Sequence, residues 1–209
     1  FSNIAASPRP AAASRYPFQS TPATVTRMLP WGHAAVGYLC YRLYTFLRRR
    51  RPPVGLAVVA LAIGTQFPDL IDKPLAWTFG ILPSGRSFAH SLLTVAVVAV
   101  LLYRFGRSQS ERTRTALFAF GFGWGTHVFS DGYTVLLGKP TCVNYLVWPL
   151  AACPYDETGR SIIAFLLAVE PTSRTMFGLA LAAVAGAIWL VDGAPGLWLL
   201  FQRVRDRLG

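Results

Sequence analysis

Five long apolar segments, separated by short clusters of arginine, constrain the fold of this chain more than any other feature. Hydrophobic residues make up 53% of its 209 residues and charged residues only 14%, whereas about a quarter of the residues in soluble domains are charged. The apolar segments cover residues 31–47, 54–67, 88–105, 115–137 and 176–201. Because a helix needs about 20 mostly apolar residues to cross a bilayer, the sequence predicts an all-α, polytopic membrane protein with about five spanning helices.

Two of the five segments are short for this purpose. Segment 31–47 is at the lower limit, and segment 54–67 would cross only if it continued through Pro68 or packed against its neighbours. A further apolar stretch, residues 161–169, is too short to cross alone, so we expect it to be re-entrant or interfacial.

The arginine clusters predict an orientation. They lie at residues 48–51, 104–114 and 203–207 and contain eleven basic residues, against five in the opposite loops. Cytoplasmic loops of membrane proteins carry an excess of Lys and Arg, so these clusters predict a cell-membrane protein with five spans and an external N-terminus. Since the basic residues sit in tight clusters between apolar segments, they favour membrane lipids as partners and argue against nucleic acid.

Residues 1–27 differ in composition from the rest of the chain. They are rich in Ser, Ala, Pro and Thr and contain no acidic residue. Two interpretations remain open: a disordered or leader segment, or upstream sequence before a natural start at Met28. In either case we expect a helical membrane domain over residues 28–209.

Histidine and aspartate side chains recur at one depth in the first four apolar segments. The candidates are His33, Asp69, Asp72, His90, His127 and Asp131. Counted from the nearest basic cluster or the inner segment start, the separations are 15 residues (33 to 48), 15 (54 to 69), 14 (90 to 104) and 13 (114 to 127). With a rise of about 1.5 Å per residue, all of them lie roughly 20 Å from the inner surface. The spacing therefore predicts one polar site near the outer leaflet.

The residue types at this depth indicate a metal site. Ionisable side chains inside a membrane are costly and usually pair, bind ions or do chemistry. Three imidazoles and three carboxylates suit Zn²⁺, with Mn²⁺ or Fe²⁺ as alternatives. Six candidates exceed the four ligands of a closed zinc site, which leaves room for one or two ions, for carboxylates that orient the imidazoles, or for a general base. Individually, each group could instead be an interfacial histidine, a loop start, or the intrahelical pair His127–Asp131.

These residues stand in short motifs whose order resembles that of a known family. The motifs are Gly32-His33, Pro68-Asp69 with Asp72, Arg86 with His90-Ser91, and His127 with Asp131. Over residues 28–137 the chain resembles the YdjM-like membrane-bound metal-dependent hydrolases. The third motif departs from the family pattern His-Arg-Gly-x-Thr-His-Ser, because Gly85, Ser87 and Ala89 replace His, Gly and Thr. The resemblance implies a metal-assisted hydrolase, and the missing imidazole puts a second metal in doubt.

The resulting hypothesis is metal-dependent hydrolysis of a phosphoester in a lipid or lipid-linked substrate, near the non-cytoplasmic face. His33, His90, His127 and Asp131 are expected as metal ligands, and Asp69 and Asp72 as ligands or general base. Arg86 could clamp a phosphate or contact lipid headgroups instead.

Two other functions remain open. Buried His and Asp side chains also serve as relays in proton- or metal-ion-coupled transporters, although the inner halves of these segments offer few polar residues. A closed metal site that only holds helices together is the other alternative. Intramembrane zinc proteolysis is not expected, because the sequence contains no H-E-x-x-H.

The remaining polar features allow two interpretations each. Cys142 and Cys153 follow the fourth segment on the predicted outer side, where they could form a disulfide or stay free. Cys40 is expected to be a small apolar residue within its helix. Asp192 is expected at a helix end near the cytoplasmic interface, followed by a surface helix over residues 196–208, with a buried functional acid as the alternative.

Overall fold

The computed structural model describes residues 28–133, 142–153, 171–199 and 201, and within these residues it is helical without strands. Residues 1–27 and 161–169 and most of the predicted surface helix lie outside this part of the chain. The elements are α1 (Pro30–Arg49), α2 (Gly55–Gly64), α3 (Phe67–Lys73), the π-helix η1 (Pro74–Thr78), α4 (Leu92–Gly106), α5 (Glu111–Asp131), the 3-10 helix η2 (Asn144–Val147) and α8 (Ser173–Val191). The predicted all-α class is confirmed.

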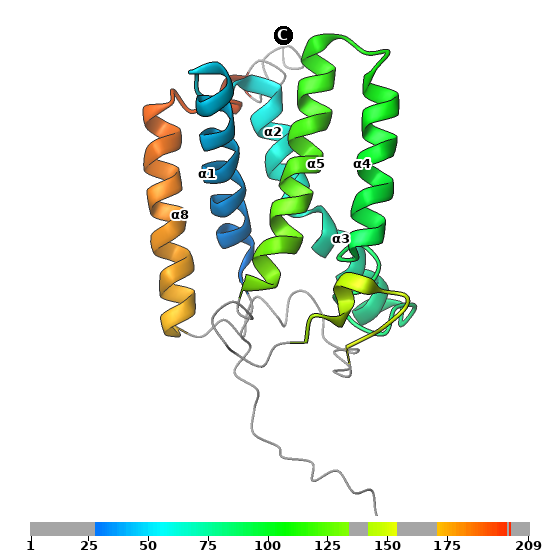
Figure 1. Cartoon of the computed structure of the whole chain (residues 1–209). Helices are drawn as coiled ribbons and strands as arrows, with labels where there is room; N and C mark the ends of the chain where they lie inside the picture. Colours follow the sequence, from blue (N-terminus) through cyan, green and yellow to red (C-terminus); the bar gives the residue numbers. More distant parts are fainter. Residues whose placement is uncertain (1–27, 134–141, 154–170, 200, 202–209) are drawn as a thin grey trace, which may run out of the picture.

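The long helices run up and down beside one another. In Figure 1, α8, α1, α5 and α4 stand side by side, while α2 descends next to α5 and leads into α3 at the lower end. The connections that carry the arginine clusters, after α1 and between α4 and α5, lie together at the upper end. The start of α1, α3 and the end of α5 therefore meet at the lower end.

The second apolar segment is longer than its composition suggested. Helical structure continues from Gly55 to Thr78, and Pro68 does not end it because the proline lies in the first turn of α3, where a backbone N–H is not needed. Within the described residues, this 24-residue stretch is the one helix both long and apolar enough to cross a membrane. Leu92–Gly106 and Thr175–Val191 are apolar but shorter, so five spanning helices are not established.

The third segment begins later than expected. Ser91 caps α4 by accepting a hydrogen bond from the Leu93 amide at 3.2 Å, so the helix starts at Leu92 and not near residue 88. His90 consequently lies in the turn before α4. This turn is able to fold back over α3 because it is not part of a helix.

Glycine allows α2 and α5 to pack in direct backbone contact. A Cβ atom on Gly64 would lie 2.1 Å from the carbonyl oxygen of Phe120, and one on Gly123 would lie 2.5 Å from that of Leu61. Small residues at such positions let helices approach closely. This contact also holds α3 and the end of α5 close together, so that the His and Asp side chains of these two elements can meet.

The last helix is attached to the first by a buried carboxylate. Asp192 follows the C-terminus of α8, as expected for a helix end, and its side chain accepts hydrogen bonds from the Tyr38 hydroxyl at 2.7 Å and from Arg42 Nε at 2.6 Å. Arg42 thus neutralises the Asp192 carboxylate within the bundle. The burial of Asp192 is therefore explained by a structural ion pair.

The glycine contact predicts a specific pattern of stability. Gly64→Ala and Gly123→Ala should each lower the free energy of unfolding by roughly 1–3 kcal/mol, because the added methyl group meets backbone that cannot move away. Gly125→Ala, in the same helix but with no atom within 4 Å of the added Cβ, should stay within about 1 kcal/mol of wild type or gain stability. Denaturant titration in detergent measures all three; equal losses would contradict the packing described.

Candidate metal centre

All six His and Asp candidates meet at the lower end of the bundle. His33 comes from the start of α1, Asp69 and Asp72 from α3, His90 from the turn before α4, and His127 and Asp131 from the end of α5. Asp72, His90 and His127 are fully buried, and His33 is nearly so. The predicted convergence of four separate segments on one site is present in the structure.

His90 Nε2 lies at the centre of a set of close donor atoms. It is 3.2 Å from His127 Nε2, 3.4 Å from Asp131 Oδ2 and 3.5 Å from Asp69 Oδ1. In a tetrahedral zinc site with metal–ligand bonds of about 2.0–2.1 Å, neighbouring ligand atoms lie about 3.3–3.4 Å apart. The observed spacing fits ligands around one shared cation.

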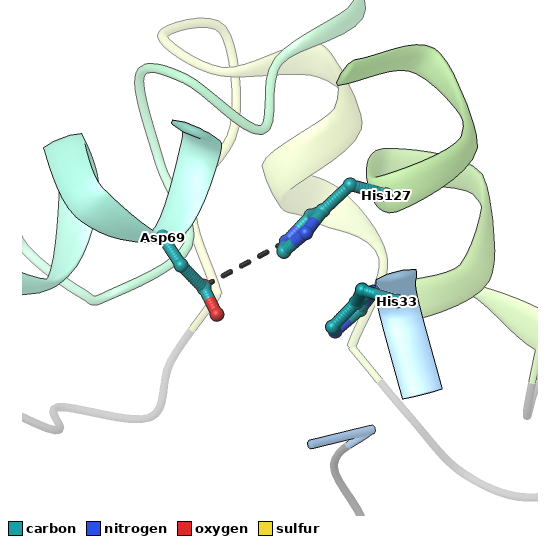
Figure 2. Close-up of side chains that lie close together, drawn as sticks. All are labelled: His33, Asp69 and His127. Carbon is teal, nitrogen blue, oxygen red and sulfur yellow. Dashed lines mark ion pairs between the residues drawn. The ribbon is translucent and has the colours of Figure 1, made fainter. Parts of the chain in front are cut away.

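His33 adds a second, overlapping set of donors. Its ring stacks on that of His127, with centroids 3.8 Å apart, and its Nε2 atom lies 3.5 Å from Asp131 Oδ1. Figure 2 shows His33 and His127 on one side and Asp69 facing them from α3. His33, Asp69 and His127 form one group that could hold a metal ion, and His90, His127 and Asp131 form another. Both groups include His127, whose Nε2 atom has a single lone pair, so one ion can use His127 in only one of the two groups at a time.

The Nδ1 atoms of His127 and His90 each face a hydrogen-bond acceptor, which determines the ring nitrogen that carries the hydrogen. His127 Nδ1 lies 2.6 Å from the Thr65 carbonyl oxygen, and because a carbonyl only accepts, Nδ1 must carry the hydrogen. His90 Nδ1 lies 2.8 Å from Asp72 Oδ2, which selects the same tautomer when the ring is neutral. Both Nε2 atoms then direct lone pairs into the cluster. This is the arrangement in which histidine binds metal.

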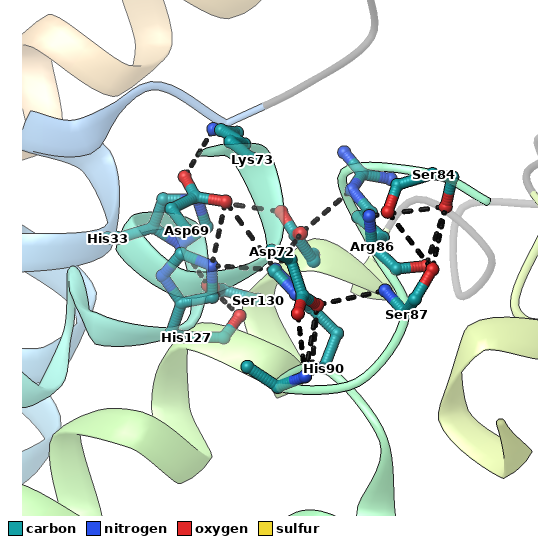
Figure 3. Close-up of polar contacts among 12 residues, drawn as sticks. His33, Asp69, Asp72, Lys73, Ser84, Arg86, Ser87, His90, His127 and Ser130 are labelled. Carbon is teal, nitrogen blue, oxygen red and sulfur yellow. Dashed lines mark hydrogen bonds and ion pairs between the residues drawn. The ribbon is translucent and has the colours of Figure 1, made fainter. Parts of the chain in front are cut away.

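Asp72 organises the turn that carries His90. Its carboxylate accepts hydrogen bonds from the backbone amides of Ser87, Ala89 and His90 at 2.9, 2.9 and 3.3 Å, in addition to the bond with His90 Nδ1. Figure 3 shows Asp72 between His90 and the Ser84–Ser87 turn. These four donors occupy the Asp72 oxygens, so Asp72 acts on His90 and its turn.

Two basic side chains flank the donor atoms. Arg86 Nε lies 2.9 Å from Asp131 Oδ2, and Lys73 forms an ion pair with Asp69 one helical turn away. The three carboxylates therefore face two permanent cations in the described part of the cluster, together with the ionisable imidazole of His90. The Arg86 and Asp69 side chains, 18% and 12% exposed, mark the side from which solvent reaches the cluster.

Sequence reasoning missed Lys73 and Tyr145. Lys73 is one of the five basic residues that the sequence assigned to the opposite loops. Its position four residues after Asp69 on a helix is, however, a recognisable signal of an ion pair. Tyr145, in η2, is fully buried; its ring meets that of His90 edge-on at 6.0 Å, and Arg86 lies 5.9 Å above it. No sequence signal identified Tyr145, because it lies after residue 137, where the chain carries no recognised motif.

Tyr145 presents an available hydroxyl beside the cluster. Its OH makes no hydrogen bond with any residue that the structure describes. Burial and the nearby Asp131 carboxylate raise the pKa of Tyr145, so the hydroxyl keeps its proton. Residues 142–153, which carry Tyr145, are held by a disulfide between Cys142 and Cys153. A hydrogen bond from Ser91 Oγ to the Trp148 carbonyl, at 2.6 Å, also holds them. Of the two states that the sequence left open for these cysteines, the structure contains the disulfide.

The departure at Gly85 has a structural reason. A Cβ atom at this position would lie 3.0 Å from the indole nitrogen of Trp77, so an imidazole here would require the buried Trp77 ring to move. In this chain Trp77 thus packs against position 85, where the pattern of the family that the chain resembles has a histidine.

These features together define an all-helical protein with buried His and Asp groups able to hold a metal ion. A comparison with protein families supports this class: the family described as YdjM inner membrane protein matches residues 28–200. The chain belongs to this family, as its motifs suggested, and membrane localisation follows from the membership. No curated protein and no solved structure matches the chain significantly.

The bonds to Asp72 predict local amide exchange. Asp72→Ala should accelerate hydrogen exchange at Ser87, Ala89 and His90 by about tenfold or more, because each amide loses a charged acceptor. Asp192→Ala removes another buried carboxylate that binds side chains at the far end of the bundle, and should leave these three amides unchanged. Exchange measured by mass spectrometry on overlapping peptides distinguishes the two variants. Equal exchange in both would show that Asp72 does not hold the turn.

Proposed function

We propose that this protein is a membrane-embedded, metal-dependent hydrolase that cleaves a phosphoester in a lipid or lipid-linked substrate near the outer leaflet. The observation that carries this proposal is the inward orientation of acceptor atoms. The Nε2 lone pairs of His90 and His127 face each other at 3.2 Å, with carboxylate oxygens of Asp69 and Asp131 at 3.4–3.7 Å. Buried acceptors so arranged repel one another unless a cation lies between them.

A metal ion explains these separations better than a proton does. A proton on His90 would be shared through a charge-assisted hydrogen bond, which typically measures about 2.7–2.9 Å between nitrogen and oxygen. The distances from His90 Nε2 to Asp69 and Asp131 are longer, at 3.5 and 3.4 Å. Three imidazoles with carboxylates favour Zn²⁺, with Mn²⁺ or Fe²⁺ as alternatives. We propose one or two ions, and a second ion would need ligands other than His127.

Each residue has a role in this proposal. His33, His90, His127, Asp69 and Asp131 supply the ligand atoms, while Asp72 orients His90 from behind. A divalent ion held by them supplies Lewis acidity that activates water and polarises a phosphoryl group. Asp69, the most exposed carboxylate of the cluster, would act either as a ligand or as the general base that takes a proton from water. Arg86 and the Tyr145 hydroxyl are placed to donate hydrogen bonds to phosphoryl oxygens.

The substrate class follows from the position of the cluster in the bundle. It lies at the end opposite the arginine clusters, and those clusters favour the cytoplasmic side. Five membrane-spanning helices with the N-terminus outside would then place the cluster at the depth of the outer headgroups. A lipid phosphoester reaches this depth without leaving the bilayer.

A proton- or metal-ion-coupled transporter is the second candidate, and a closed metal site that joins helices is a third. The transporter is favoured by the single observation that His90 lies within 3.5 Å of two carboxylates and could carry a mobile proton.

Cleavage in vesicles tests the hydrolase. Wild-type protein in vesicles of mixed phospholipids that include phosphatidic acid should release inorganic phosphate or phosphorylated headgroups, detected by mass spectrometry. His127→Ala with Asp131→Ala should abolish release, and Arg86→Gln should reduce it by about 100-fold, the typical cost of losing one oxyanion donor. Asp192→Asn, a buried acid far from the cluster, serves as the control and should retain full activity.

A different outcome would select one of the alternatives. Metal-loaded protein that cleaves no phosphoester, but moves protons or metal ions across the vesicle membrane, would establish the transporter. Metal-loaded protein that does neither would leave the structural site.

A further inference from the structure

A second site lies at the arginine end of the bundle, far from the His and Asp cluster. Helices α1, α2, α4 and α5 surround a cavity of about 1110 Å³, which is as large as the sites that hold small molecules, typically about 300–1,000 Å³. Helix α4 packs against α5, and residues of α4 and of α1 line the cavity between these two helices. Nothing in the proposed hydrolysis uses this space.

The inner wall of the cavity is apolar and aromatic. Tyr44, Phe118 and Phe122 form a contacting aromatic group from α1 and α5, with ring centroids 5.3–6.0 Å apart. Leu102 and Ala99 line the side formed by α4. Such a wall fits a hydrocarbon chain.

Arginines gather at the other side of the cavity. Its lining includes Arg49, Arg51, Arg107 and Arg114, and contains no acidic residue. None of the four forms an ion pair with a carboxylate in the described part of the chain, whereas Arg42 and Arg86 do. Four exposed arginines that line one cavity without an acidic residue make its surroundings electropositive, so the cavity favours an anionic occupant.

We propose that this cavity binds an anionic glycerophospholipid from the leaflet that faces the arginine end. The phosphate lies among the four arginines, whose guanidinium groups bind phosphate oxygens in pairs. One acyl chain lies along Tyr44, Phe118, Phe122 and Leu102. Basic pockets between membrane helices bind acidic phospholipid headgroups in this way. The lipid fills the space between α4 and α1 and so ties α4 to the rest of the bundle.

Native mass spectrometry of protein in mild detergent, titrated with phosphatidylglycerol, tests the proposal. The wild type should bind phosphatidylglycerol in preference to phosphatidylcholine. Replacing the four lining arginines (R49Q, R51Q, R107Q, R114Q) should weaken binding at least about tenfold. The control replaces four arginines of the same end that do not line the cavity (R48Q, R50Q, R104Q, R112Q) and should bind as wild type does. Both variants lose the same charge, so effects on orientation or expression are matched.

Filling the apolar wall gives a second, charge-independent measurement. Ala99→Phe should reduce phosphatidylglycerol binding at least about tenfold, because its ring occupies the acyl-chain position, while Val100→Phe, exposed beside it on α4, should not. Thermal unfolding of each variant without lipid confirms that it is folded. Because the His and Asp cluster is intact in all of these variants, their metal content reports on the hydrolase proposal separately.

Three results would overturn the lipid site. If both fourfold arginine variants lost phosphatidylglycerol binding equally, the lipid would be attracted by the overall positive charge of this end and not by the cavity. Displacement of phosphatidylglycerol by millimolar inorganic phosphate would identify a free anion as the ligand. Unchanged binding to the Ala99→Phe variant would show that no acyl chain enters the cavity.

Discussion

The lower end of the bundle brings buried imidazole and carboxylate groups together, and their charges have to be balanced. The Nε2 atoms of His90 and His127 lie 3.2 Å apart, and carboxylates from α3 and α5 surround them. Lys73 and Arg86 neutralise two of the three carboxylates. The proposed metal ion would supply a further positive charge between these groups. Its ligands would then join α1, α3, α5 and the turn before α4.

The two ends of the bundle carry different groups: the His and Asp cluster lies at one end and the arginine-lined cavity at the other. The compact contact between α2 and α5, made through Gly64 and Gly123, places α3 opposite the end of α5 at one end. At the other end α4 and α1 remain apart and enclose the arginine-lined cavity. The helices thus hold the proposed metal cluster and the proposed lipid cavity at opposite ends of the same core. In a membrane the two would face different leaflets.

The position of the candidate site was predictable because helical rise is nearly constant. Counting residues from the arginine clusters placed His33, Asp69, His90 and His127 at one depth, and antiparallel helices then brought them together. The roles of the carboxylates were less accessible to sequence, since Asp69 and Asp72 are equivalent in the pattern. Only the fold of the Ser84–Ser91 turn shows that Asp72 is occupied by backbone amides.

Other features depended on contacts between distant parts of the chain. The sequence allowed Arg86 either to clamp a phosphate or to contact lipid headgroups, and it did not reveal that the Arg86 side chain pairs with Asp131. Tyr145 reaches the cluster through a loop held by the Cys142–Cys153 disulfide. The number of spanning helices was also predicted from composition alone, and one stretch of the described chain meets the length and hydropathy requirements together. Helix length depends on local caps such as Ser91, which hydropathy does not detect.

Metal content tests the central claim most directly. Freshly purified wild-type protein should contain a stoichiometric divalent metal by inductively coupled plasma mass spectrometry. The double variant His127→Ala, Asp131→Ala should contain none, and Asp192→Asn should match wild type. Wild-type protein without metal above background, even after incubation with Zn²⁺, Mn²⁺ or Fe²⁺, would contradict the account and identify the cluster as a network of hydrogen bonds around a protonated histidine.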